Sequence, residues 1–248
     1  MTARRLPLAR LALWTTSAAG VLAGVRAAFG HAPPLVLSLG VFGDVFARGP
    51  EGRPEIALTF DDGPNPATTP RVLALLAEHG ARATFFVLGQ KALAHASLVR
   101  TIAREGHTVG IHGHVHDRLY SLRSARFVER DLERACAAVE QALGATPTLF
   151  RPPVGFVSGA VAVAAERRGL TLVGWSARTL DGWSGTPPER VLARATATLE
   201  NGAILVLHDA AERDDRVPAS LDVLGELLGR VRERGLRAVT IDALRREA

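Results

Sequence analysis

Short apolar runs alternate with helical patterns along most of this chain, from Glu55 to Ile241. The run at 203–208 is apolar almost throughout, as in a strand that is buried on both faces. The pattern at 124–143 places apolar residues at spacings of three and four, which indicates one buried helix face. Strands that alternate with helices favour a parallel sheet or a barrel over a sandwich.

The expected elements cover the chain after its first fifty or so residues. We expect strands at 55–60, 83–89, 107–111, 148–151, 170–175, 203–208 and 237–241. We expect helices at 69–80, 97–106, 124–143, 158–168, 187–202 and 219–234. This amounts to about seven strands, each followed by a helix or a loop. The 248 residues suffice for one sizeable α/β domain or two small ones, and a 47% hydrophobic content can supply a core.

The N-terminal region, residues 1–46, differs from the rest. A basic start precedes an uncharged run at 11–24, and a second apolar run lies at 33–43. This order is typical of a secretory signal or a membrane anchor, although each run is shorter than the roughly 20 residues that a membrane span needs. A cleaved signal, one anchor, a hairpin of two spans and a soluble packing segment all remain open. We expect membrane attachment through this region and a location at the cell membrane or envelope.

The segment 47–54 is rich in glycine, proline and charge. Such a composition is typical of a linker. We therefore expect the folded catalytic domain to occupy residues 55–248.

The net charge of +5 and the pI of about 10.7 would suit an anionic partner. However, no zinc-knuckle spacing is present, aromatic residues make up only 5%, and they are not interleaved with cations. We therefore predict no nucleic-acid partner and interpret the arginines as solvated helix faces. The single cysteine, Cys136, excludes an internal disulfide and a cysteine-based metal cage.

Polar clusters follow five of the expected strands. In chain order they are Asp61 and Asp62; His112, His114 and His116; Arg151; Arg178, Asp181 and Trp183; and His208 and Asp209. The carboxyl ends of strands in a parallel β/α fold share one edge, where the loops converge. The coincidence of all five clusters with that edge predicts a functional site there.

Two histidines four residues apart, His112 and His116, favour a metal site, since imidazole is a common metal ligand. With Asp62 they would leave an open coordination position for water or substrate. Other readings remain open for each cluster. The sequence TFDDGP at 59–64 could be a turn, the histidine-rich loop could be solvated, and His208 could be a satisfied core histidine.

Taken together, these motifs resemble those of the polysaccharide deacetylase family, the NodB-homology domain of carbohydrate esterase family 4. TFDDGP resembles the first family motif, GHTVGIHGHVH the second, RPPVG the third and LVLHD the fifth. Their order and spacing agree from about Glu55 to the C-terminus. The family fold is a distorted (β/α) barrel with fewer strands than the eight-stranded form. We therefore expect a barrel of about seven strands, preceded by the apolar membrane segment.

The resemblance implies a metal-dependent hydrolase that removes acetyl groups from N-acetylated sugars. Peptidoglycan, a chitin-like oligomer and a surface or lipid-linked glycan are the candidate substrates. Asp61 is implied as the general base, His208 as the general acid, and Arg151 as the partner that keeps Asp61 ionised. One divalent ion is implied, Zn²⁺ first, with Co²⁺ or another ion as alternatives. Its implied ligands are Asp62, His112 and His116.

The implied substrate contacts are Pro153, Gly155, Trp175, Asp181 and Leu207. Val206 is the alternative to Leu207 in lining an apolar pocket for the acetyl methyl group.

The fourth motif departs from the family pattern W-x-x-D-x-x-D-W, since this chain has WSARTLDGW. Arg178 stands where the first Asp belongs, and Trp183 lies one residue late. That Asp usually tunes the catalytic histidine, so either Asp181 takes over its role or Arg178 contacts an anionic group of the substrate. The departure leaves two alternatives open: a degenerate glycan-binding module that retains metal without turnover, and a metal-dependent hydrolase of another bond. The additional His114 is either a substrate contact or a solvated bystander.

Overall fold

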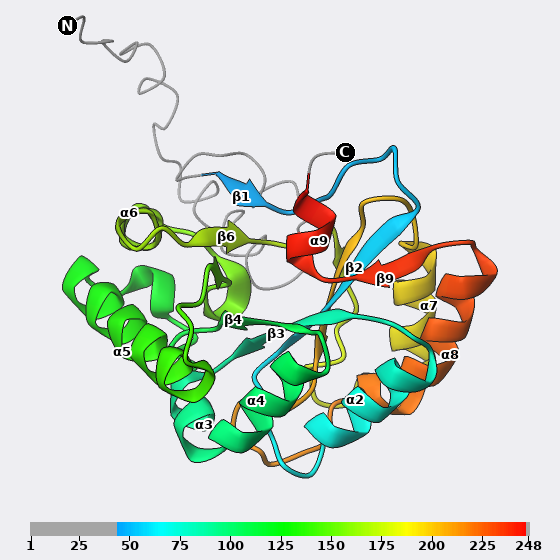
Figure 1. Ribbon diagram of the computed structural model, residues 1–248, viewed down its shortest axis with the longest axis horizontal. Helices are drawn as coiled ribbons and strands as arrows, with labels where there is room; N and C mark the ends of the chain where they lie inside the picture. The colour runs from blue at the N-terminus through cyan, green and yellow to red at the C-terminus, as the bar shows by residue number, and fades with distance from the viewer. Residues whose placement is uncertain (1–43, 247–248) are drawn as a thin grey trace, which may run out of the picture. The chain divides into compact units, whose positions relative to one another are not determined.

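A curled parallel sheet with most of its helices on the outer side organises residues 44–246, the part of the chain that the computed structural model describes (Figure 1). Its nine strands follow the order β1-β6-β5-β4-β3-β2-β8-β7, with β9 paired to β2. Their bounds are β1 Val45–Phe46, β2 Glu55–Asp61, β3 Ala83–Val87, β4 Thr108–Ile111, β5 Leu149–Phe150, β6 Thr171–Val173, β7 Ala177–Arg178, β8 Ile204–His208 and β9 Arg237–Val239. Within the described chain the end strands β1 and β7 do not pair, so the sheet is a half-barrel.

Helices follow most of the strands. The α-helices are α2 Thr69–Glu78, α3 Gly89–Ala94, α4 Ala96–Arg104, α5 Ala125–Leu143, α6 Gly159–Arg167, α7 Pro188–Ala197, α8 Ser220–Glu233 and α9 Ile241–Arg245, and the 3₁₀ helices are η4 Tyr120–Leu122 and η5 Pro153–Gly155. Helix α5 shows how the sequence sets these bounds. The Ser124 side chain accepts the N–H of Phe127 at its start, and Gly144 ends it in the left-handed conformation at φ 72°.

Every strand and helix expected from the sequence is present. Two further strands, β1 and β7, have two residues each, which is too short for a periodic signal. Strand β1 already belongs to the sheet through its pairing with β6. The segment 47–54 is the loop from β1 into β2, and Gly49 in it donates its N–H to the Gly202 carbonyl at 2.8 Å.

The predicted signal or anchor lies almost wholly outside the described residues. Between residues 44 and 246, no helix is both long and apolar enough to cross a bilayer.

Strand alternation divides the core into two clusters, because successive side chains point to opposite faces. The outer cluster packs the sheet against α2 to α8, and from β2 it includes Ile56, Leu58 and Phe60. The inner cluster consists of Ala57, Phe86, Leu149, Val173, Trp175, Ile204, Val206, Ile241 and Leu244. The last two belong to α9, which therefore covers the inner face. Burial of each large apolar side chain contributes about 1.5–3 kcal/mol.

The same alternation places polar side chains at the carboxyl ends of the inner face. Thr59 and Asp61 share the inner face of β2 with Ala57, and His208 shares that of β8 with Ile204 and Val206. The inner face is therefore apolar below and polar at the edge where the loops converge.

Candidate functional site

Arg151 joins the central strands at the polar edge and is fully buried. Its Nη1 donates to Asp61 Oδ1 at 2.8 Å and to Thr59 Oγ1 at 2.7 Å. Its Nη2 donates to the Gly174 carbonyl at 2.7 Å, and the guanidinium carbon lies 4.3 Å from the centre of the Phe86 ring. The predicted pairing of Arg151 with Asp61 is therefore present. It fixes one oxygen of a carboxylate that is only 3% exposed.

The two neighbouring aspartates have different surroundings. Asp62 follows β2 with φ 73°, a left-handed conformation that Asp tolerates better than most residues. Its Oδ1 lies 3.6 Å from Nε2 of His112 and 3.6 Å from Nε2 of His116. These distances are too long for hydrogen bonds, and within the described chain this buried oxygen has no hydrogen-bond partner.

A divalent cation fits this group. One atom from each of Asp62, His112 and His116 lies within 4.8 Å of the others. Two imidazole nitrogens and one carboxylate oxygen form the donor set of an open catalytic zinc site. A bound cation would also satisfy the unpartnered Asp62 oxygen, whose burial is otherwise costly.

The hydrogen bond of His112 prepares its ring for a metal. Its Nδ1 lies 2.7 Å from the Arg151 carbonyl, which can only accept. Nδ1 must therefore carry the proton, which leaves the Nε2 lone pair facing Asp62. Burial lowers the pKa of His112, against the opposing charges of Asp61 and Asp62. Both effects favour the neutral imidazole that a metal requires.

Sequence reasoning missed Glu212, in the loop after β8. Its Oε2 lies 3.0 Å from Nδ1 of His116 and accepts from Nε of Arg118 at 3.0 Å. Glu212 thus lies behind His116 on the side away from Asp62, where carboxylates often orient a metal-binding histidine. Its sequence signal was weak, because one acid in AAERDD resembles any solvated loop residue.

His208 lies beside Asp61, since the two residues are register partners on neighbouring strands. Its Nδ1 is 3.0 Å from Asp181 Oδ1, and its backbone N–H donates to Asp181 Oδ2 at 2.7 Å. Burial opposes protonation, but Asp181, with smaller contributions from Asp62 and Asp61, raises the pKa of His208 to about 10. The family places an Asp at position 178 to contact the catalytic histidine, and this chain has Arg178 there. Asp181 supplies that carboxylate contact to His208 instead.

Gly155, one of the two substrate contacts predicted from the third motif, lies against Trp175. A Cβ on Gly155, which has φ 75°, would come within 2.0 Å of the Trp175 ring. Only glycine therefore lets this loop lie against the tryptophan. Pro153, two residues earlier in η5, is buried beside Gly113 of the histidine loop.

Leu207 is misplaced in the prediction. It is fully buried in the outer cluster, under the helices. Val206, the alternative, belongs to the inner cluster with Trp175. The physical reason is the two-residue period of a strand, which puts Val206 and His208 on one face and Leu207 on the other.

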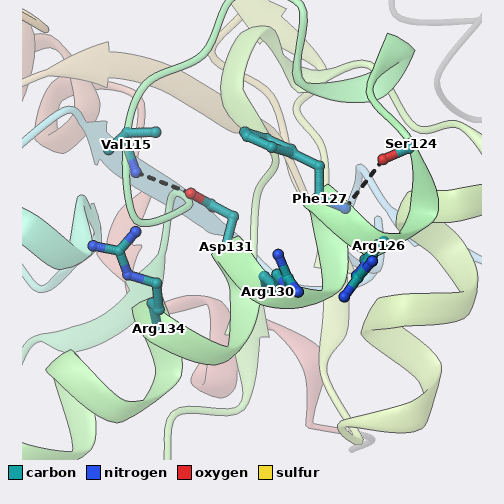
Figure 2. Close-up of a pocket in the computed structure, with 7 residues that line it drawn as sticks. All are labelled: Val115, Ser124, Arg126, Phe127, Arg130, Asp131 and Arg134. Atoms are coloured by element: carbon teal, nitrogen blue, oxygen red, sulfur yellow. Dashed lines mark hydrogen bonds between the residues drawn. The ribbon is translucent and has the colours of Figure 1, made fainter.

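His114 is not a solvated bystander. It is 5% exposed, and its backbone N–H donates to Asp131 Oδ2 at 2.8 Å. Figure 2 shows the neighbouring contact, in which Asp131 on α5 accepts the N–H of Val115. Asp131 thus anchors the histidine loop to α5. An acid on the buried face of a predicted helix was the signal that could have identified it.

The pocket in Figure 2 lies beside this anchor, with a volume of about 340 Å³. Its lining residues are Val115, Ser124, Arg126, Phe127, Arg130, Asp131 and Arg134. None of the proposed ligands or proton-transfer residues lines it, so we do not assign the reaction to it.

Comparison with known proteins places this arrangement in context. The family model described as polysaccharide deacetylase matches residues 48–173. The peptidoglycan-N-acetylglucosamine deacetylase PgdA of Listeria monocytogenes is 39% identical over 193 residues, or 76% of this chain and 38% of that protein. The chitooligosaccharide deacetylase of Sinorhizobium fredii is 38% identical over 169 residues, or 68% of this chain and 78% of that protein.

A solved structure is also similar. That of the peptidoglycan deacetylase PdaC from Bacillus subtilis is 28% identical, covers 79% of this chain and 91% of that chain, and has a TM-score of 0.69. The chain spans about two fifths of the length of the Listeria relative.

Proposed function

This chain belongs to the polysaccharide deacetylase family, and from that premise we propose that it is a metal-dependent hydrolase that removes acetyl groups from N-acetylated sugars. The observation that carries the proposal is the convergence of three groups at one edge of the sheet. These are the Asp61–Arg151 pair, the His208–Asp181 pair and the ligand group around Asp62. The names of its relatives mention peptidoglycan and chitooligosaccharides, and we propose both as candidate substrates of this chain.

The residues divide the proton transfers between them. Asp61, oriented by Arg151, accepts the proton of the attacking water. His208, protonated at neutral pH, donates a proton to the departing amine nitrogen, as a group with a pKa raised to about 10 can. As register partners on adjacent strands, the two residues are close enough to act on one substrate amide.

Asp62, His112 and His116 would hold the divalent ion, for which we propose Zn²⁺. When bound, the ion supplies Lewis-acid polarisation of the acetyl carbonyl. Val206 and Trp175 provide the apolar surface of the inner face near the site, which suits the acetyl methyl group.

The binding-module alternative rested on the loss of the carboxylate at position 178. Asp181 contacts His208 through both its ring and its backbone. The argument for a binding module without turnover is therefore weak. The Asp61–Arg151 and His208–Asp181 pairs also favour amide hydrolysis over a metal-dependent reaction at another bond. Membrane attachment through residues 1–46 and an envelope location remain predictions, which fractionation of cells with an antibody to the domain would test.

Acetate release tests the proposed activity. Purified protein loaded with Zn²⁺ or Co²⁺ should release acetate from N-acetylglucosamine oligomers or peptidoglycan fragments. Each event should lower the product mass by that of C₂H₂O. Treatment with a chelator should abolish release, and the metal should restore it. Glycan binding with no acetate from any of these substrates would support the binding module instead.

The Asp181–His208 pair predicts a pH effect. In the wild type we expect kcat to fall on the alkaline side as the pH approaches the His208 pKa of about 10, because His208 then loses the proton that it donates. Asp181→Asn removes the carboxylate that contributes most to raising that pKa, so His208 should lose its proton at lower pH. The alkaline limb of the kcat–pH profile should move to lower pH. Asp222→Asn, at an exposed position on α8, is the control. An unmoved limb in Asp181→Asn would assign the acid role to another group.

A further inference from the structure

Strand register determines where Arg178 points. On β7, Arg178 pairs with Val206 of β8, and Ala177 pairs with Leu205. Register partners on adjacent parallel strands project to the same face of a sheet. The Arg178 side chain therefore projects from the inner face of the sheet. Val206 and His208, the proposed catalytic acid, project from the same face.

Arg178 has no ion-pair partner among residues 44–246. Asp181 acts on it through space but is already engaged by His208 and Thr179. A second cation is close, because Nε of Arg194 on α7 donates to the Arg178 carbonyl at 3.1 Å. Burial and Arg194 lower the pKa of Arg178, against the charge of Asp181. A half-buried guanidinium beside another cation favours the binding of an anion.

Trp183 provides a second element at the same place. It is 52% exposed, and the Arg178 guanidinium carbon lies 5.7 Å from its ring centre. The preceding residue, Gly182, lies against the catalytic histidine: a Cβ there would come within 2.6 Å of the His208 ring. Trp183 is thus one residue away from backbone that touches His208. An exposed aromatic face beside a fixed cation suits a sugar ring with a charged substituent.

We propose that Arg178 and Trp183 form a subsite for a carboxylate-bearing sugar next to the N-acetylated sugar that is deacetylated. This inference rests on the function proposed above and narrows its substrate class to acidic glycans. The carboxylate would form a bidentate pair with Arg178, while the sugar ring stacks on Trp183. A neutral chitin-like oligomer would leave the guanidinium without its partner.

Three substrates of equal length test the subsite. The first alternates N-acetylglucosamine with N-acetylmuramic acid, whose lactyl group carries the carboxylate. The second is the same oligomer with that carboxylate amidated, and the third is a chitin oligomer. We expect the wild type to prefer the free acid by about tenfold in kcat/KM, mainly through KM. Arg178→Gln should reduce this preference to about one, whereas Arg190→Gln, at an exposed position on α7, should retain it.

The outcomes separate the subsite from the reaction. Equal rates on the acid and its amide in the wild type, or a preference that survives Arg178→Gln, would overturn the subsite while deacetylation stands. Absence of acetate from all three substrates would instead overturn the proposed function. Calorimetric titration with the acid and amidated oligomers then tests the subsite by itself. We expect about tenfold weaker binding of the acid by Arg178→Gln, and unchanged binding would contradict the subsite.

Discussion

Asp61→Asn should lower kcat for acetate release by about 10²–10⁴-fold, the usual contribution of a positioned general base. The amide cannot take a proton from water, but it keeps the shape of the side chain and can still accept from Arg151 Nη1. The ligand group around Asp62 is left intact, so zinc binding should persist. Acetate release gives the rate, and metal analysis after gel filtration gives the zinc content of the same sample.

Asp62→Asn is the matched control, because it makes the same chemical change one residue later. Asp62 Oδ1 faces both imidazoles, whereas Asp61 Oδ1 pairs with Arg151. We expect Asp62→Asn to lose zinc as well as activity. Undiminished acetate release from Asp61→Asn would refute its role as the base, and loss of zinc from it would show that the two roles are not divided in this way.

The edge at which the site forms could be predicted from the sequence, because it depends on local pattern. Five of the seven expected strands end at a polar cluster, and parallel strands bring their ends together whatever their order in the sheet. The ligand triad and the Asp61–Arg151 pair followed from that placement and the family resemblance. The short strands β1 and β7 were missed, since two residues carry no period and only pairing with a distant strand defines them.

Most errors within the site come from contacts between segments far apart in the chain. Leu207 is the exception, because the two-residue period of β8 already places Val206, rather than Leu207, on the face of His208. Glu212 acquires a role only because its loop folds back beside His116. His114 seemed solvated because its anchor, Asp131, comes from a helix further along the chain. Local pattern does not encode such contacts.

Arg151→Met should lower the free energy of unfolding by about 3–5 kcal/mol, the usual cost of removing one partner from a buried ion pair. Methionine keeps an unbranched apolar stem in place of the aliphatic part of the arginine but supplies no donor. Asp61, only 3% exposed, would keep a buried charge without its counter-ion, and the Gly174 carbonyl and Thr59 hydroxyl would each lose a hydrogen bond. Urea unfolding in the presence of a chelator measures the loss without stabilisation by a bound cation.

A double variant separates the buried charge from the loss of packing. In Arg151→Met with Asp61→Leu both charges are absent, so we expect the protein to recover much of the stability that Arg151→Met alone loses. Arg167→Met, which breaks an exposed ion pair with Glu129, should cost less than about 1 kcal/mol. If Arg151→Met cost no more than Arg167→Met, the Asp61–Arg151 pair would contribute no more to stability than an exposed ion pair, which would contradict the prediction. If the double variant were as unstable as the single one, the cost would come from the lost hydrogen bonds and from packing on Phe86, rather than from the charge of Asp61.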